Sequence, residues 1–134
     1  MSAAGLALQT AIHAALVADA GIGAIVGDRI FDAVPRVATF PYVTLGDARA
    51  ADWSTGTEPG AEHRVTLHVW SRARGKSECW AVLAALQAVL HDAALALEGH
   101  ALINLRVEAA DVGMDRDGIT WHGVVRLRAV TEPN

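Results

Sequence analysis

Six histidines are the residues of this 134-residue sequence that most readily suggest chemistry, because imidazole nitrogens bind zinc and other transition metals. Zinc sites can usually be recognised in a sequence by ligands at short, regular spacings. His63 and His68 are five residues apart in one predicted strand, so their side chains point to opposite faces. The others lie in separate elements, at His13, His91, His100 and His122. We therefore expect no metal site and interpret the histidines as solvated or hydrogen-bonded structural residues.

Acidic residues offer two further kinds of chemistry. The sequence DRDG at 115–118 resembles the start of a calcium loop but lacks the later ligands, including the closing Glu. Asp and Gly also suit a tight turn, which we predict here. Four carboxylates of the central segment are candidates for acid/base chemistry if they converge, but a solvated acidic loop explains them better: Asp47, Asp52, Glu58 and Glu62.

Motifs for nucleophilic catalysis and nucleotide binding are missing from the sequence. No Gly-x-Ser-x-Gly pattern occurs around any serine. The glycines of GIGAIVG at 21–27 follow a predicted helix, whereas a nucleotide loop follows a strand and carries a phosphate-binding Lys. We predict no catalytic residue and no cofactor.

The positive charge is concentrated in one turn, at Arg72, Arg74 and Lys76, with Arg64 nearby. This turn has three interpretations: contact with phosphate, a solvated turn, or contact with an acidic surface of a partner protein. The net charge of -4 argues against a protein whose main function is to hold DNA, although it allows DNA to pass nearby.

Trp53 is unusual because it occurs in a polar segment rich in Gly, Ser, Thr and Pro. Exposed tryptophans are often anchors of protein interfaces. The ring can also fold back and cover the core. Both interpretations remain open.

Hydrophobic periodicity predicts the elements that position these residues. The pattern predicts helices over 3–19 and from Ser77 to about Ala96, with a short turn at 22–26 between the first helix and the strands. Alternating segments predict strands over 42–50, 62–70, 101–112 and 119–132. Gly46 to Ala61 is expected to contain a long exposed loop. The resulting fold class is α+β, with an antiparallel sheet of about four strands and two main helices packed on one face.

Three of these segments carry specific predictions about burial. Alternation should place Val65, Leu67 and Val69 on one buried face of their strand. The corresponding sets in the last two strands are Ile103, Leu105 and Val107, and Ile119, Trp121, Val125 and Leu127. The single cysteine, Cys79, cannot form an internal disulfide and should be a small buried apolar residue.

The length fits a single domain spanning 1–134. The N-terminal segment is rich in Ala and Leu, but it has no basic region, and polar residues interrupt its apolar run. We therefore expect an amphipathic helix of a cytoplasmic protein with no membrane partner.

Several motifs occur in an order that resembles one family. They are GDRIFDAVP at 27–35, FPYVTLG at 40–46, the Trp53 loop, EHRVTLHVWSRARGKSE at 62–78 and the late DRDG hairpin. This arrangement resembles the tail terminator, or tail completion, proteins of long-tailed phages, and most closely the branch found in prophages and gene transfer agents. The resemblance implies a structural virion protein, not an enzyme, that is assembled in the bacterial cytoplasm and located at the neck, or top, of the tail.

The same resemblance implies an assembly and its partners. The expected assembly is a homohexameric ring that caps the tail tube, ends its polymerisation and meets the connector of the filled head, while DNA passes through the lumen. We expect contacts at Arg72, Arg74 and Lys76, which would pair with acids of a neighbouring subunit or ring, and at Trp53; the acidic candidates are Glu58 and Glu62. The alternatives are a head-to-tail connector protein of another level and a small ligand-binding or enzymatic α+β domain.

Overall fold

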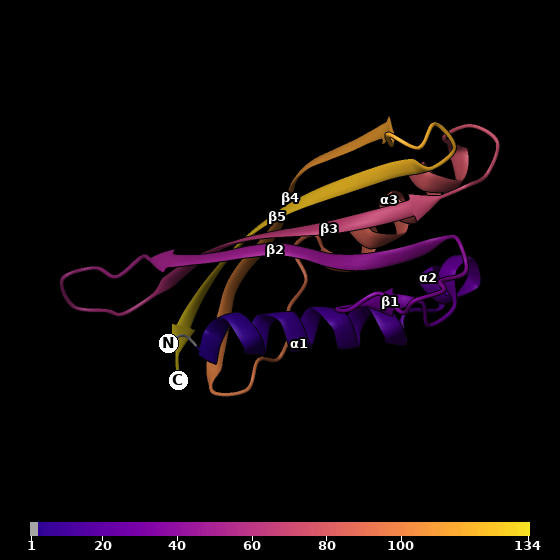
Figure 1. Ribbon diagram of the computed structural model, residues 1–134. Coiled ribbons are helices and arrows are strands. Elements are labelled where there is room, and N and C mark those ends of the chain that lie inside the picture. Colours follow the sequence, from indigo (N-terminus) through magenta and orange to yellow (C-terminus); the bar gives the residue numbers. More distant parts are fainter. Residues whose placement is uncertain (1–2) are drawn as a thin grey trace.

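The structure, a computed structural model, describes residues 3–134, so the predicted domain 1–134 begins two residues before the described part. Figure 1 shows three helices and a long, twisted sheet. The helices are α1 (Ala3–Ala18), α2 (Ala20–Val26) and α3 (Ser77–Leu90). The strands are β1 (Ile30–Phe31), β2 (Tyr42–Asp52), β3 (Ala61–Ser71), β4 (His100–Met114) and β5 (Trp121–Pro133).

The sheet confirms the α+β class but corrects its details. Its five strands lie in the order β1-β2-β3-β5-β4, and β1 runs parallel to β2 while all other neighbours are antiparallel. The prediction of about four antiparallel strands therefore missed β1. A two-residue strand is too short to show any periodicity, which explains why the sequence did not reveal it.

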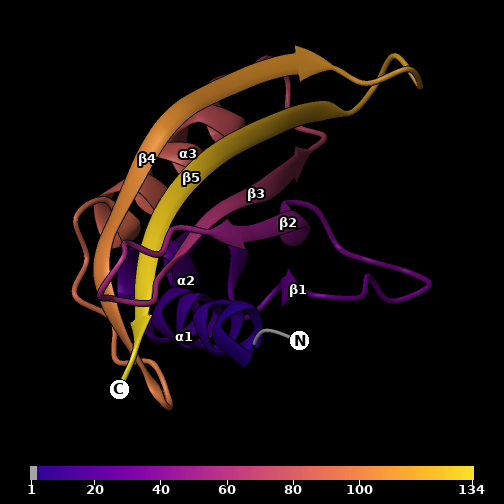
Figure 2. The same ribbon diagram turned by 90° about the vertical axis from the view of Figure 1, so that its left-hand side faces the viewer.

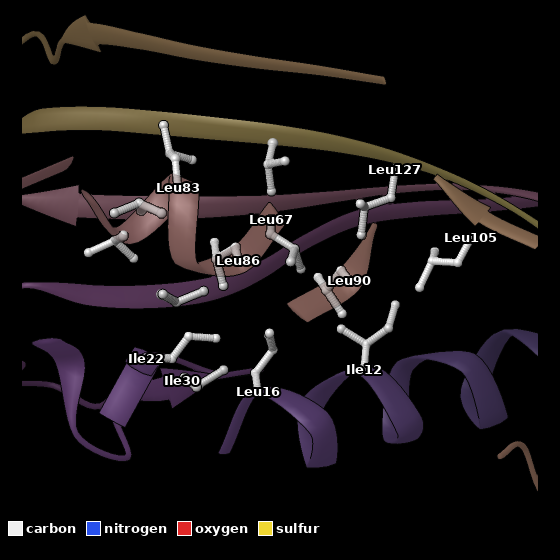
Figure 3. Close-up of a cluster of buried hydrophobic side chains, with 14 of the residues drawn as sticks. Ile12, Leu16, Ile22, Ile30, Leu67, Leu83, Leu86, Leu90, Leu105 and Leu127 are labelled. Atoms are coloured by element: carbon white, nitrogen blue, oxygen red, sulfur yellow. The ribbon is translucent and has the colours of Figure 1, made fainter. Parts of the chain in front are cut away.

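All three helices pack on one face of the sheet. Figure 3 shows the resulting core, in which side chains of α1 and α3 meet those of the central strands. Leu67 and Val69 of β3 are fully buried, as the alternation predicts, and so is Cys79. Figure 2 shows β4 and β5 arching with α1 on the inner side of the arc. The opposite face, called here the uncovered face, carries Trp70, His122 and Arg128, and no helix of residues 3–134 lies against it (Figure 2).

Both helix predictions needed adjustment around their ends. The predicted short turn is α2, a helix of seven residues whose first turn is capped by the Asp19 carboxylate, 2.9 Å from the backbone N of Ile22. The helix expected to reach Ala96 ends at Leu90 instead. Asp92 adopts a positive φ of 56°, and its N–H donates to the carbonyl of Leu105 at 2.8 Å. The chain thus leaves the helix to reach β4, although its sequence remains apolar.

Half of the predicted loop from Gly46 to Ala61 is strand. β2 continues to Asp52, and only residues 53–60 form the connection to β3. A register shift between Leu45 and Ala48 interrupts the β2–β3 ladder, and a Cβ at Gly46 would collide with the His68 ring. The bulge disguises the alternation on which the prediction depended.

Two isoleucines lie outside the core, contrary to the prediction. Ile103 is 52% exposed because a register shift between Leu102 and Asn104 turns its side chain outward, while Leu105 remains buried. Ile119 is 58% exposed because it belongs to the turn before β5.

Among residues 3–134, no single helix combines the length and apolar composition that a membrane span needs. The bent pair α1 and α2, which meet at 78°, reaches these thresholds only when the two helices are counted together.

Gly123 allows α3 to approach β5 closely, and this contact generates a stability prediction. A Cβ at Gly123 would lie 2.7 Å from the Cys79 Sγ atom, whereas a Cβ at Gly113 meets nothing within 4 Å. We expect Gly123→Ala to lower the free energy of unfolding by about 1–3 kcal/mol through overpacking, measured by urea denaturation. Gly113→Ala, in the adjacent strand, is the matched control and should cost far less. Equal effects of the two substitutions would contradict this account of the α3–β5 contact.

Candidate partner-binding site

The predicted cationic turn connects β3 to α3 and is held at both ends. The hydroxyl of Ser71, the last residue of β3, donates to Glu78 Oε1 at 2.7 Å, which joins the strand to the first turn of α3. The Arg72 Nε donates to Thr120 Oγ1 at 3.0 Å, and its guanidinium lies 4.3 Å from the centre of the Phe40 ring. The corner is therefore fixed to two other loops of the subunit.

The three cations of this corner are not equivalent. Arg72 is engaged within the subunit, since its guanidinium also lies 3.7 Å from the Asp117 carboxylate. The Lys76 ammonium lies 5.6 Å from the centre of the Trp121 ring. Arg74 is exposed and makes no ion pair or side-chain hydrogen bond within residues 3–134. Of the predicted cluster, Arg74 is the residue best placed to meet a partner.

The DRDG segment forms the turn that its composition predicts. Asp117 Oδ1 accepts hydrogen bonds from the backbone N–H groups of Ile119 at 2.9 Å and Thr120 at 2.8 Å. Gly118 has a φ of 73°. Hydrogen bonding, first from the Thr120 hydroxyl and then from the Ile119 N–H, lowers the pKa of Asp117. The carboxylate thus organises a turn and supports Arg72.

The loop 53–60 ends the β2–β3 hairpin and carries an acidic tip, defined by Asp52 and Glu58. The Ser54 hydroxyl donates to Asp52 Oδ1 at 2.6 Å, and the Thr55 N–H donates to the carbonyl of Glu58 at 2.8 Å. Both acidic residues are exposed. Because β3 connects this tip to the cationic corner, the two charged features lie at opposite ends of an 11-residue strand.

Trp53 and Glu62 both contact Arg128 on the uncovered face. The Trp53 side chain is 53% exposed, and the guanidinium of Arg128 lies 5.2 Å from the centre of its ring. The ring therefore lies over the outer side of the sheet and leaves the core to the helices. Glu62 accepts a hydrogen bond from Arg128 Nε at 2.7 Å, so its charge is largely compensated within the subunit.

Positive charge is concentrated in a second place besides the turn, so the prediction that the turn holds the only cluster of cations was wrong. Four arginines lie in one row across four neighbouring strands of the uncovered face. The pairing register places Arg49 of β2 opposite Arg64 of β3, Arg64 opposite Arg128 of β5, and Arg128 opposite Arg106 of β4. We call these four residues the arginine row. Adjacent strands lie about 4.8 Å apart, so the row spans about 14 Å.

Carboxylates compensate the positive charge of the two inner members of the arginine row, Arg64 and Arg128. Arg64 pairs with Glu108 and lies 3.7 Å from Glu62, which also pairs with Arg128. The outer members, Arg49 and Arg106, have no ion pair with the residues that the structure describes. Each arginine occupies a polar position of an alternating strand, but the row itself depends on the register, which the sequence does not show.

A half-buried aromatic cluster supports the uncovered face near the cationic corner. The rings of Trp70 and His122 stack at 4.1 Å with 4° between their planes, and Trp70 Nε1 donates to Thr44 Oγ1 at 3.1 Å. His68 Nδ1 lies 2.7 Å from His122 Nε2. Trp70 thus anchors the end of β3 on the side opposite the core.

The histidines are hydrogen-bonded structural residues, as predicted. His63, which is buried, contacts the Thr131 hydroxyl at 2.9 Å. The remaining contacts involve His13, His68, His91, His100 and His122. Within residues 3–134, no three His, Cys, Asp or Glu side chains gather as a metal site requires.

Neither Cys79 nor the space beneath β2 forms a reactive site. Burial, followed by the nearby Glu78, raises the pKa of the Cys79 thiol to about 11, so the thiol stays protonated at neutral pH. A cavity of about 200 Å³ between α1 and β2 is lined by residues that include Leu8, His63 and Leu67. This volume is below that of typical small-molecule pockets.

Three histidines generate a pH prediction. Burial lowers the pKa of His63, His68 and His122 from the usual 6.5, so the folded state resists their protonation. Their contribution to stability is complete above pH 6.5 and is lost as the pH falls from 6.5 toward the lowered pKa values. We expect a lower free energy of unfolding at pH 5.5 than at pH 7.5, measured by urea denaturation. The difference should shrink in the double variant His68→Gln, His122→Gln; an unchanged difference would contradict this assignment.

Comparisons with known proteins agree on one family. The family model of "Tail completion protein gp17" matches residues 10–132. A curated relative, the tail completion protein gp17 of Bacillus phage SPP1, is 26% identical over 95 residues, which cover 71% of this chain and 70% of the relative. A chain in a solved structure of the virion of a native gene transfer agent particle is 33% identical, with a TM-score of 0.90 and coverage of 98% of this chain and 99% of that chain. The protein described here belongs to the gp17 family of tail completion proteins.

Proposed function

We propose that this protein forms a ring that caps the tail tube of a phage or gene transfer agent particle. The ring ends polymerisation of the tube and joins the tail to the connector of the head, and DNA passes through its lumen. The observation that carries the proposal is the likeness to the chain of the gene transfer agent virion, which extends over nearly the full length of both chains. A chain with almost no additional segments fits the same structural place in a particle.

The distribution of charge supports a closed ring. The acidic tip and the exposed Arg74 lie at opposite ends of β3, about 33 Å apart at the rise of an extended strand. A contact between the tip of one copy and the corner of the next would be heterologous, because each copy contributes a different surface. Repeated heterologous contacts close into rings when the rotation between copies allows it. Glu58 and Arg74 are the residues that we assign to this contact.

The outer surfaces of the helices also support burial in an assembly. α1 contains no Asp, Glu, Lys or Arg, and its outer side exposes Leu6 and Val17. α3 contains Glu78 as its only charged residue, and Trp80 is 45% exposed on its outer side. Helices on the surface of a monomeric protein usually carry charged residues on their solvent side. The lack of charge favours contact with neighbouring subunits.

The alternatives have less support. A ligand-binding or enzymatic domain needs a pocket with converging polar groups. The cavity between α1 and β2 has a volume of only about 200 Å³, and the larger hollow of about 630 Å³ between α1 and residues 96–100 is lined mainly by alanines. A connector protein of another level would share the size and the partners of a tail terminator. The family match favours completion of the tail over that position.

Deletion of the protein tests the function directly. Particles assembled without it should contain overlong tail tubes, or tails that do not join heads, because polymerisation lacks its cap. Negative-stain electron microscopy measures the tube lengths and counts the joined particles. Complementation with the wild-type gene is the control, and tails of normal length that join heads in the deletion strain would overturn the proposal.

The subunit contact has its own test at Arg74. We expect Arg74→Glu to weaken ring formation by about tenfold, since it places like charges at the contact with the acidic tip. The fold should persist because Arg74 has no partner within the described subunit. Analytical ultracentrifugation measures association. Arg116→Glu, also an exposed arginine in a turn, is the matched control, and the double variant Arg74→Glu, Glu58→Arg should recover association. Equal association of Arg74→Glu and wild type would exclude this contact.

A further inference from the structure

The hollow beside α1 combines an apolar wall with one negative charge. It has a volume of about 630 Å³, and its lining includes Leu6, Ala7, Ala11, Ala96, Glu98 and His100. The Leu6 side chain is 67% exposed. Glu98 is the only Asp, Glu, Lys or Arg in the lining, and it makes no ion pair with the residues that the structure describes. An occupant of this hollow should therefore be apolar and carry one positive charge.

The β1–β2 loop, residues 32–41, has these complementary features. Figure 2 shows the loop projecting away from the sheet and the helices. Its tip carries Val34 and Val37, which are 47% and 88% exposed. Arg36 lies between them and makes no ion pair within residues 3–134. Val37 and Leu6 are the two most exposed large apolar side chains of the described residues. Exposed apolar residues gathered in one place mark a binding surface.

The base of the β1–β2 loop is fixed within the subunit. Arg29 Nε donates to the carbonyl of Pro41 at 3.0 Å, which ties the chain before β1 to the chain before β2. The Tyr42 ring packs against Phe31 and Phe40, with ring centres 5.9 Å and 5.0 Å apart. A segment held in this way loses less conformational entropy when it binds.

The β1–β2 loop and the hollow lie at opposite ends of the subunit. The centre of the Phe40 ring lies 4.3 Å from the guanidinium of Arg72, so the loop leaves the sheet at the cationic corner. His100 in the wall of the hollow and Ala61 at the start of β3 both pair with the last residues of β5, so the hollow lies at the end that carries the acidic tip. A neighbouring copy whose corner meets the acidic tip therefore brings its β1–β2 loop to the end where the hollow lies.

We propose that the β1–β2 loop of one copy inserts into the hollow beside α1 of the next copy in the ring. Val34 and Val37 pack against the apolar wall that contains Leu6. Arg36, between the two valines, pairs with Glu98. This proposal rests on the proposed function, because it assumes a ring, and it adds a second contact between the same two copies. Specific interfaces bury about 1,200–2,000 Å² in total, which an ion pair between two loops does not supply by itself.

Charge and position favour a second copy as the occupant. Residues 33–39 of the loop contain Arg36 as their only charged residue, while Asp32 directly follows β1 at the base. The other exposed apolar turn at this end of the subunit, 115–119, contains two Asp and one Arg, so Glu98 would repel it. DNA phosphates would meet the same carboxylate, and no Lys or Arg lines the hollow. The chain itself thus supplies the segment that matches the hollow, at the end that the ring contact requires.

Cysteine cross-linking in assembled particles tests the occupant. Val37→Cys and Thr10→Cys, a residue of the hollow, are made in separate copies and co-expressed in the deletion strain, so a 10–37 disulfide can form only between copies. The native Cys79 is buried and does not compete. We expect a disulfide-linked dimer after oxidation, with the 10–37 linkage identified by peptide mass spectrometry.

Ile119→Cys replaces Val37→Cys in the matched control, because Ile119 is also exposed at the corner end, and it should give no linkage to position 10. Absence of the 10–37 linkage, an equal yield at 10–119, or a disulfide from position 37 to a different protein of the particle would each overturn the proposal.

Charge exchange separates this contact from the proposed function. Arg36→Glu should weaken association about tenfold in analytical ultracentrifugation, because it places like charges together, and the double variant Arg36→Glu, Glu98→Arg should recover it. Arg116→Glu is the control and should have no effect. If deletion of the protein impairs tails but Arg36→Glu associates like wild type, the loop has no such role and the proposed function stands. Normal tails in the deletion strain, with the 10–37 linkage still formed in particles, would overturn the proposed function and leave this contact in place.

Discussion

Burial of one face of the sheet beneath α1, α2 and α3 is the constraint on which the other features depend. The core is built from that face and from the inner sides of the helices, with Gly123 allowing α3 to approach β5 near Cys79. The second face has no helix to bury it, so its strands alternate apolar and polar residues. A sheet of this kind leaves a broad polar surface available for contacts with other molecules.

The two ends of β3 illustrate how this constraint produces rigid contact surfaces. At one end, Ser71 donates to Glu78 of α3, Arg72 donates to Thr120, and Asp117 orders the turn that contains Thr120. At the other end, Asp52 and the backbone of 55–58 organise the loop. Surfaces that are already ordered lose less conformational entropy when they bind. Arg72 therefore acts within the subunit, where it orients the segment that presents Arg74.

The sequence predicted the elements well where the periodicity was regular. The α1 helix, the β3 strand, the β4–β5 hairpin and the DRDG turn depend on local patterns that the tertiary structure leaves intact. The errors occur where a tertiary contact overrides the pattern. The bulge at Gly46 obscured how far β2 continues, the bulge at Ile103 reversed one side chain, and the docking of 91–97 ended α3 early. In each place the sequence analysis identified the apolar residues correctly, but not the backbone geometry that orients their side chains.

The candidate site shows the same division between local and long-range information. The cationic turn was visible because its residues are neighbours in sequence, whereas Arg49, Arg64, Arg106 and Arg128 become a row only through the register of four strands. The four neighbouring arginines of the row repel one another. Glu62 and Glu108 offset this repulsion only for the inner pair, Arg64 and Arg128. A sheet that served only to stabilise the subunit could place neutral residues at the outer positions without loss. Arg49 and Arg106 instead stand at the two ends of the row without an ion pair among the described residues, so the uncovered face keeps uncompensated positive charge that another molecule can meet.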